Sequence, residues 1–296
     1  MSVDRWAVQP IPGDGCAKIE GESMTLRQTA YGKFHAARVL FQFIKYLINW
    51  REVWSAYRNR SPLPPLALRS GYTLHHGPGD EPIGLLQEVM IHGVYRKYLR
   101  EPLSGTVIDL GANIGASTLD LIAHFPSVQV HAWEPNPETF GRLQRNIEAN
   151  GLTDRVKLYP RAAARNSGQM QMWISVPSIY ATVYRDSLAN MPEIGLRPDQ
   201  ARPVMVESNG LDDVIAETGS DRVALLKIDA EGAEADILEG ASRETLAKVR
   251  QIAIEYHDHL VPGSLSRSRR AMEEAGFTCA VDVYNPTGGL LYGWRD

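Results

Sequence analysis

The chain has 296 residues, of which 44% are apolar and 22% charged, a mixture typical of a folded globular protein and not of a disordered one. The formal net charge of −4 provides no overall basic field for a nucleic-acid backbone. No apolar run reaches the roughly 20 residues of a membrane-spanning helix, and the first residues lack the pattern of a signal peptide. The two cysteines are too few for a disulfide framework or a metal cluster, so we expect a cytoplasmic protein.

The first predicted element is a long helix over residues 33–58, after a mixed, glycine-containing segment. Polar residues recur there at steps of three and four and form one narrow stripe, while the rest of the helix is apolar. Such a face is expected to pack on its own domain or on a second subunit; a helix at a membrane surface is the alternative. We favour a homodimer over membrane contact. The proline-rich segment 61–65 ends this helix, and residues 1–69 are predicted to form an N-terminal helical extension.

Strands and helices alternate over most of residues 70–296, after a helix that is expected to begin at Pro82 and a break near residue 102. Seven strands are predicted, at 106–110, 128–134, 155–164, 223–230, 250–257, 278–284 and 288–294. Helices are predicted at 117–125, 136–151, 232–241 and 266–277. This alternation predicts an α/β fold of Rossmann type, with a central, mostly parallel seven-stranded sheet and helices on both faces.

The segment 168–210 lies between the third and fourth strands and is longer than an ordinary crossover. Its aromatic residues Trp173, Tyr180 and Tyr184 are suited to lining an acceptor pocket or a lid. An added β-hairpin on the edge of the sheet is an equally good interpretation. We therefore treat 168–210 as an inserted substrate or lid region within the larger domain.

A glycine-rich turn, "VIDLGANIG" at 107–115, follows the first strand of the predicted sheet. Gly111 and Gly115 are expected to let a ligand approach the backbone, at the strand end where doubly wound sheets bind ligands. The dinucleotide pattern G-x-G-x-x-G is absent. Asp109 would repel a phosphate but attract an ammonium or sulfonium group. The turn therefore predicts S-adenosylmethionine as cofactor, with Asn113 either bonding the methionine carboxylate or holding the turn.

The acid at the end of the second strand supports a nucleoside ligand. Glu134 lies nineteen residues after Gly115, a spacing suited to hydrogen bonds with ribose hydroxyls. Asn136 follows and is a candidate for the ribose or for the cap of the next helix. Ser117, in the first turn of the preceding helix, completes this set of candidate cofactor residues.

The catalytic candidates lie at the ends of the fourth and fifth strands. Lys227, Asp229 and Glu231 alternate in sequence, which puts them on one side if the chain stays extended. His257 ends the fifth strand and is the preferred general base, because its ordinary pKa is close to neutral pH.

Three alternatives accompany these assignments. Lys227 and Asp229 are also suited to a structural ion pair that shapes the sulfonium pocket. Glu234 is interpreted only as an acid in the first turn of a helix. Asp229, Glu255 and His257 are able to hold a divalent cation, although the spacing does not require a metal, and no residue is assigned as a metal ligand.

Four motifs resemble the FkbM family of S-adenosylmethionine-dependent class I methyltransferases: "VIDLGANIG", "WEPNP", "LDDVI" and "LKIDAEGAEADILEGA". The resemblance covers about residues 70–275, and the last motif is the most specific of the four. It implies the class I methyltransferase fold and O-methylation of hydroxyl groups on polyketides, sugars or other secondary metabolites. Family members often carry a small polar or acidic residue near the adenine, where this chain reads "RAAARNSG". Adenine recognition is therefore expected from backbone groups around Ala163 and Ala164, or from another loop.

The favoured function is O-methylation of a hydroxyl on a small molecule in natural product biosynthesis. Methylation of a nitrogen on a small molecule and a non-catalytic scaffold that binds S-adenosylmethionine are the alternatives. A nucleic-acid methyltransferase is disfavoured, because the fourth strand ends in "KIDAEGAE" without an Asn/Asp-Pro-Pro-aromatic motif. A nicotinamide-dependent dehydrogenase is disfavoured by the missing third glycine.

Overall fold

The computed structural model describes residues 35–100, 103–174, 181–182, 201–285 and 287–295. The chain divides into two compact units, Met1–His75 and His76–Asp296, whereas the sequence predicts a boundary after residue 69. Among the described residues, every helix is too short or too polar to cross a bilayer.

Over residues 35–75, the described part of the N-terminal unit contains two helices where the sequence predicts one. This part consists of a helix over 35–46, helix α2 (Trp50–Asn59) and an antiparallel pair of strands, β1 (Leu66–Ala67) and β2 (Thr73–Leu74). Between the helices, Leu47 forms a β-bridge with Leu68, and the Asn49 side chain accepts a hydrogen bond from the Ala67 amide at 3.1 Å. These contacts with the β1 segment replace helical hydrogen bonds, so the prediction of one continuous helix over 33–58 is wrong.

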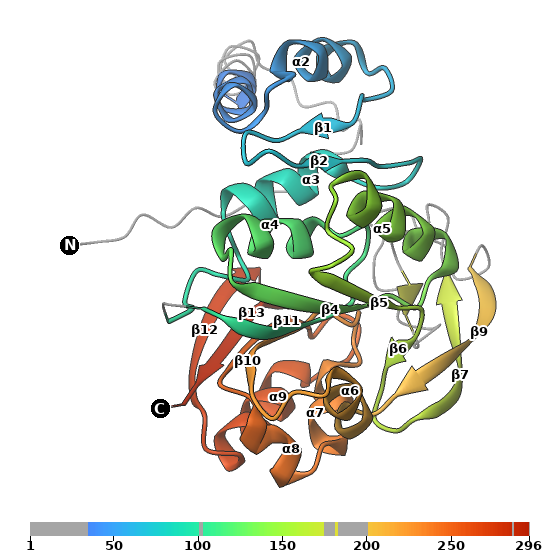
Figure 1. Cartoon of the computed structure of the whole chain (residues 1–296), viewed down its shortest axis with the longest axis vertical. Coiled ribbons are helices and arrows are strands. Elements are labelled where there is room, and N and C mark those ends of the chain that lie inside the picture. Colours follow the sequence, from blue (N-terminus) through green and yellow to red (C-terminus); the bar gives the residue numbers. More distant parts are fainter. Residues whose placement is uncertain (1–34, 101–102, 175–180, 183–200, 286, 296) are drawn as a thin grey trace, which may run out of the picture. The chain divides into compact units, whose positions relative to one another are not determined.

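The larger unit is built on a seven-stranded sheet in the order β12-β13-β11-β10-β3-β4-β5 (Figure 1). Its strands are β3 (Gly105–Leu110), β4 (Val128–Trp133), β5 (Val156–Tyr159), β10 (Val223–Ile228), β11 (Gln251–His257), β12 (Thr278–Asn285) and β13 (Gly288–Trp294). Neighbouring strands are parallel except at β13, which runs antiparallel to both β11 and β12. The predicted mostly parallel sheet is confirmed. Chain order reverses between β3 and β10, which is the topological switch point.

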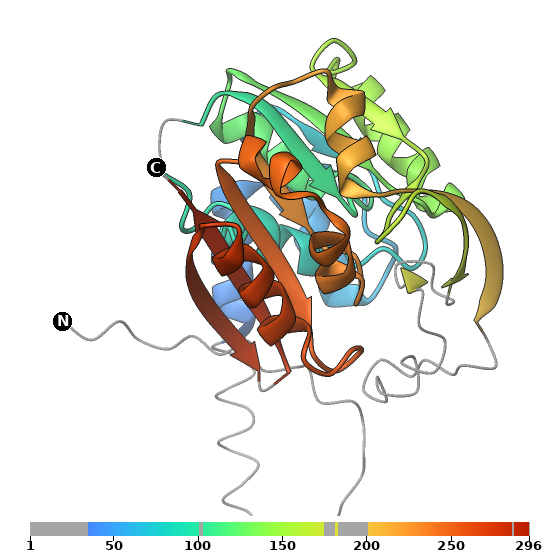
Figure 2. The same cartoon turned by 90° about the horizontal axis from the view of Figure 1, so that it is seen from below.

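Helices cover both faces of this sheet, as Figures 1 and 2 show from two directions. One face carries α4 (Ala116–His124) and α5 (Pro137–Ala149), and the other carries α6 (Leu211–Thr218), α7 (Glu234–Gly240), α8 (Arg243–Lys248) and α9 (Ser264–Glu274). The strands between them read as near-continuous apolar runs because both sheet faces are buried. The helix predicted from Pro82 begins there as α3 (Pro82–Leu85) and continues as a π-helical turn, η1 (Leu86–Ile91).

A second, four-stranded sheet lies beyond β5, in the order β6-β9-β7-β8. It contains β6 (Ala162–Ala163), β7 (Gly168–Ile174), β8 (Ala181–Thr182) and β9 (Arg202–Asn209). The strand predicted over 155–164 is therefore wrong as one element: it divides at Pro160, which has no backbone N–H to continue the ladder, and its halves enter different sheets.

The antiparallel pairing of β7 with β9 agrees with the hairpin interpretation of 168–210, but these strands form the separate sheet and do not extend the edge of the seven-stranded one. The lid interpretation concerns mainly residues 175–180 and 183–200, which include Tyr180 and Tyr184. These residues lie outside the part of the chain that the structure describes.

Candidate active site

The turn after β3 packs closely against the end of β10. Gly111 has a φ of 74°, and a Cβ atom at this position would lie 1.8 Å from the carbonyl oxygen of Asp229. Gly115 has a φ of 95°, and its Cβ would lie 2.9 Å from Cδ1 of Leu143. The sequence predicts these glycines as clearance for a ligand, but the fold itself already favours both: Gly111 by its contact with the Asp229 backbone and Gly115 by its positive φ.

Asp109 lies beneath this turn and is completely buried. Its Oδ2 accepts hydrogen bonds from the hydroxyls of Ser117 and Thr118, both at 2.7 Å, and its Oδ1 lies 3.0 Å from Nζ of Lys227. The carboxylate charge is thus compensated inside the protein. The predicted attraction of a sulfonium by Asp109 is not supported by this position, and Ser117 likewise directs its hydroxyl to Asp109.

Lys227 is as buried as Asp109 and donates to the carbonyl oxygen of Gly111 at 2.6 Å. It also lies 3.6 Å from Oδ2 of Asp229. Burial opposes the charged form, but Asp109 and Asp229 outweigh it and raise the pKa of Lys227 above its ordinary value. Lys227 therefore keeps its proton at neutral pH, and its position favours the alternative of a structural ion pair, while a catalytic role stays a prediction.

Glu134 joins the turns that follow β3 and β4. Its Oε2 accepts from the backbone N–H of Asn113 and its Oε1 from that of Asn136, both at 2.9 Å. Asn113 adopts a left-handed φ of 51° and holds the turn, because its Oδ1 accepts from the Ile114 amide at 2.7 Å. Asn136 caps α5 by accepting from the amide of Glu138 at 3.1 Å. Each oxygen of Glu134 retains a second lone pair for a ligand.

Burial raises the pKa of Glu134 to about 7, although the N–H groups of Asn136 and Asn113 act to lower it. The side chain is 7% exposed. The ring of Trp133, the residue before it, stacks on Tyr159 with centroids 4.0 Å apart. This stack supports the strand ends beneath Glu134, and sequence reasoning did not single it out.

The candidate cofactor residues fall into two places. Asp109, Gly111, Asn113, Gly115, Ser117, Glu134 and Asn136 belong to the β3–α4 and β4–α5 regions. Ala163 lies apart from them in β6, where it pairs with Asn209 of β9. Contact of these eight residues with a cofactor stays a prediction.

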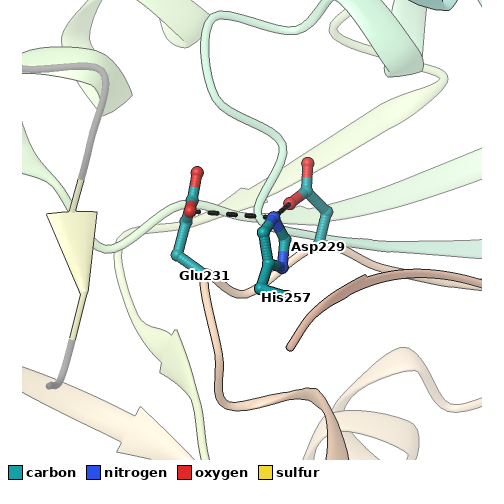
Figure 3. Close-up of side chains that lie close together, drawn as sticks. All are labelled: Asp229, Glu231 and His257. Atoms are coloured by element: carbon teal, nitrogen blue, oxygen red, sulfur yellow. Dashed lines mark ion pairs between the residues drawn. The ribbon is translucent and has the colours of Figure 1, made fainter. Parts of the chain in front are cut away.

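A second group of side chains lies where β10 and β11 end (Figure 3). His257 is buried, and its Nε2 lies 3.9 Å from Oδ1 of Asp229 and 3.7 Å from Oε2 of Glu231. Glu231 is not on an extended strand as predicted, because β10 ends at Ile228 and Glu231 occupies a turn with a φ of 47°. The turn nevertheless brings Glu231 to the other two side chains.

Glu234 anchors His257 from the opposite side. Its Oε1 lies 2.8 Å from Nδ1 of the ring and also accepts the amide of Gly232 at 2.9 Å, while its Oε2 accepts the hydroxyl of Ser264 at 3.3 Å. The interpretation of Glu234 as an acid that only complements a helix dipole is therefore wrong: it is fully buried and orients the imidazole. A carboxylate in the first turn of a helix gives no indication in sequence of a histidine brought in by β11.

Tyr95 connects Asp229 to a further carboxyl group. Its hydroxyl lies 3.0 Å from Oδ2 of Asp229 and 2.7 Å from Oε2 of Glu255, and one phenol proton cannot fully serve both. Burial, reinforced by neighbouring carboxylates, raises the pKa of Glu255 to about 7 and the pKa of Glu88 to about 8. Sequence reasoning missed Tyr95 and Glu88, which come from the segment before the sheet.

The pKa values of Glu231 and His257 reflect their burial and the charged groups around them. Burial raises the pKa of Glu231 to about 8. Burial acts to lower the pKa of His257, but Glu234 and Glu231 outweigh it and hold it well above its ordinary value. Among the described residues, the cationic partners of this group are His257 and Lys227, and Lys227 already serves Asp109. This end of the sheet therefore favours a positively charged species.

Comparison with known proteins identifies the family. The model of the "Methyltransferase FkbM domain" matches residues 109–279, more than half of the chain. The chain is 29% identical over 237 residues to the 31-O-demethyl-FK506 methyltransferase FkbM of Streptomyces tacrolimicus, covering 73% of this chain and 90% of that protein. It is 30% identical over 165 residues to the 2-O-methyltransferase NoeI of Sinorhizobium fredii, covering 54% of this chain and 66% of that protein.

A solved structure of methyltransferase FkbM from Methylobacillus flagellatus KT aligns with 88% of this chain and 59% of its own length, at 17% identity and a TM-score of 0.48. The family match covers the β3–α4 turn, Glu134 and the Asp229–His257 region together. The chain therefore belongs to the FkbM family of methyltransferases.

Proposed function

We propose that this methyltransferase transfers a methyl group from S-adenosylmethionine to a hydroxyl group of a small molecule. One observation carries the proposal: the turn at Gly111 lies directly against the Asp229 carbonyl. The Glu134 side of the site and the Asp229–His257 side are thus held together at the carboxyl ends of β3 and β10. Ligands of doubly wound sheets bind at this switch point.

The proposed donor site uses the turns after β3 and β4. Glu134 accepts hydrogen bonds from the ribose hydroxyls with its remaining lone pairs, and the turn around Gly111 to Gly115 holds the methionine part. Backbone groups near Ala163 meet the adenine. Glu134 supports this assignment, because both of its oxygens are already fixed in position by backbone N–H groups.

The proposed reaction is an in-line displacement. The acceptor oxygen attacks the methyl carbon, the carbon–sulfur bond breaks with its electrons on sulfur, and the sulfonium becomes a neutral thioether. The hydroxyl proton leaves to the group formed by Asp229, Glu231 and His257. His257 is the predicted base, but Glu234 and Glu231 hold its pKa well above the ordinary value, which disfavours the neutral form that a base requires.

Transfer to oxygen is favoured over transfer to nitrogen by the relatives. Two proteins similar to this chain are named as methyltransferases at the 31-O and 2-O positions of their substrates. The acceptor of this chain is proposed at the level of a secondary-metabolite or sugar hydroxyl. A cytoplasmic location, the absence of nucleic-acid and membrane partners, and a homodimer through residues 33–58 stay predictions; light scattering of the chain with and without residues 1–60 tests the dimer.

The test begins with calorimetric titration of S-adenosylmethionine and NAD into the wild type, Glu134→Gln and Glu148→Gln. Glu148 is an exposed α5 residue and serves as the control. We expect S-adenosylmethionine to bind wild type and Glu148→Gln alike and Glu134→Gln at least tenfold more weakly, with no NAD binding. Equal affinity of all three chains for S-adenosylmethionine would show that Glu134 is not part of the cofactor site.

Catalysis is then measured by transfer of labelled methyl groups to a panel of hydroxyl and amine compounds, with the products identified by mass spectrometry. O-methylated products support the proposal. Products methylated only at nitrogen would replace it with the N-methyltransferase alternative. Cofactor binding without transfer to any compound of the panel favours the scaffold.

A further inference from the structure

We propose that Asp229, Glu231 and His257 bind a divalent metal ion of the Mn²⁺ or Mg²⁺ type. The site would occupy the acceptor half, and the inference does not depend on methyl transfer, because it concerns metal binding alone. The sequence offers Asp229, Glu255 and His257 as a possible ligand set, whereas in the structure Glu231 lies in the group with Asp229 and His257.

The three donor atoms have the spacing of a ligand set. They lie within 4.8 Å of one another, and Figure 3 shows a ring nitrogen of His257 directed between the carboxylates of Asp229 and Glu231. An octahedral ion with bonds of about 2.1 Å places adjacent ligands about 3 Å apart. The separations of 3.9 and 3.7 Å from Nε2 therefore close by less than about 1 Å, within reach of carboxylate rotation.

The second observation is the state of the buried imidazole. Its Nδ1 faces Glu234 at 2.8 Å, which fixes the ring so that Nε2 points at the two carboxylates, beyond hydrogen-bond distance from either. Metal-binding histidines are typically held in this way, with the other nitrogen bonded to a carboxylate. The backbone of Asp229 is also fixed, because its N–H donates a hydrogen bond to the carbonyl oxygen of Leu110 at 3.0 Å.

The charged groups around this site favour a small divalent ion over a larger monovalent cation. Tyr95 places Glu255 next to Asp229, and Lys227 lies closer to Asp109 than to Asp229, so a further cation would add to the two that these carboxylates share. An organic ammonium group is the competing ligand. Acceptors around an ammonium nitrogen at about 2.8 Å lie about 4.6 Å apart, wider than the separations from Nε2 here. A bound ion would supply a Lewis acid that lowers the pKa of an acceptor hydroxyl.

The experiment is titration of the full-length chain with Mn²⁺, followed by the electron paramagnetic resonance signal of the free ion. Asp229→Asn, Glu231→Gln, His257→Gln and the control Glu148→Gln are compared, with thermal unfolding recorded for each. We expect one ion per chain in wild type and Glu148→Gln, displaced by excess Mg²⁺, and at least tenfold weaker binding in the other three. Glu231→Gln is decisive, because this turn residue is part-exposed and contributes least to the core.

Equal Mn²⁺ binding by Glu231→Gln and Glu148→Gln, or no saturable binding by wild type, would overturn the metal site. Saturable binding of methylammonium in place of Mn²⁺, lost in Glu231→Gln, would overturn it in favour of a cationic acceptor. Affinity for S-adenosylmethionine is measured in parallel with a chelator present. Retained cofactor affinity without Mn²⁺ binding rejects the metal and leaves the proposed function standing.

Discussion

The two halves of the candidate site differ in how fully their charges are paired. Around the β3–α4 turn, Asp109 has Ser117, Thr118 and Lys227 within 3.0 Å and no exposed surface. At the ends of β10 and β11, the nearest carboxylates lie 3.7 and 3.9 Å from Nε2 of His257. The first half is complete as folded, whereas the second half is completed by what binds to it. Substitutions around the β3–α4 turn should therefore lower stability, whereas substitutions at the ends of β10 and β11 should mainly change ligand binding.

The largest effect is expected from Lys227→Met, which keeps most of the side-chain volume and removes the charge. The charge of Asp109 is then left buried without a cation, which typically lowers the free energy of unfolding by about 3–5 kcal/mol. Denaturant unfolding measures the loss. The double variant Asp109→Asn, Lys227→Met removes both charges and should recover most of it; a double variant as unstable as the single one would contradict the pairing.

The next largest effect is expected from Gly111→Ala, compared with Gly105→Ala. Both glycines have positive φ, 74° and 88°, but a Cβ at position 105 meets nothing within 4 Å. The backbone conformation alone costs about 1 kcal/mol in each variant. The clash with the Asp229 carbonyl should add about 3 kcal/mol for Gly111→Ala. Equal unfolding free energies would show that the two halves are not in contact.

A smaller effect is expected from the pH dependence of stability at Glu134. Its pKa of about 7 when folded lies above the ordinary 4.5, so the folded chain holds this proton more tightly. The stabilisation is complete below pH 4.5 and is lost as the pH rises through 7, by up to about 3 kcal/mol. Unfolding of wild type and Glu134→Gln is compared from pH 4 to 8. Parallel curves for the two chains would mean that Glu134 does not titrate in this range.

The smallest effect is expected from Asn136→Ala, which removes the cap of α5. Loss of a capping side chain costs about 1 kcal/mol. Asn136→Ser retains the cap and should unfold close to wild type. Cofactor affinity in Asn136→Ser separates the two predicted roles of this residue: a large loss of affinity with unchanged stability would show a ribose contact beyond the cap.

Sequence periodicity was sufficient for the sheet, because apolar runs such as 223–228 are interpretable without knowing what they pack against. It failed where a hydrogen bond to a distant residue replaces one within a helix. The Asn49 side chain accepts a hydrogen bond from the Ala67 amide, and the helix is interrupted there. The glycine turn was located correctly, but its steric reason depends on the Asp229 carbonyl, more than a hundred residues away. Pairing of Glu234 with His257 likewise depends on the fold.

Gly111 also limits how this chain can diversify. Every other amino acid carries a Cβ, and the atom that it would meet at 1.8 Å belongs to the backbone, so no change of rotamer relieves the contact. Glu231, by contrast, is a part-exposed turn residue, so its side chain can be replaced without such a clash. A mutational scan of this edge of the sheet should therefore show losses of folding at position 111 and losses of ligand binding at position 231.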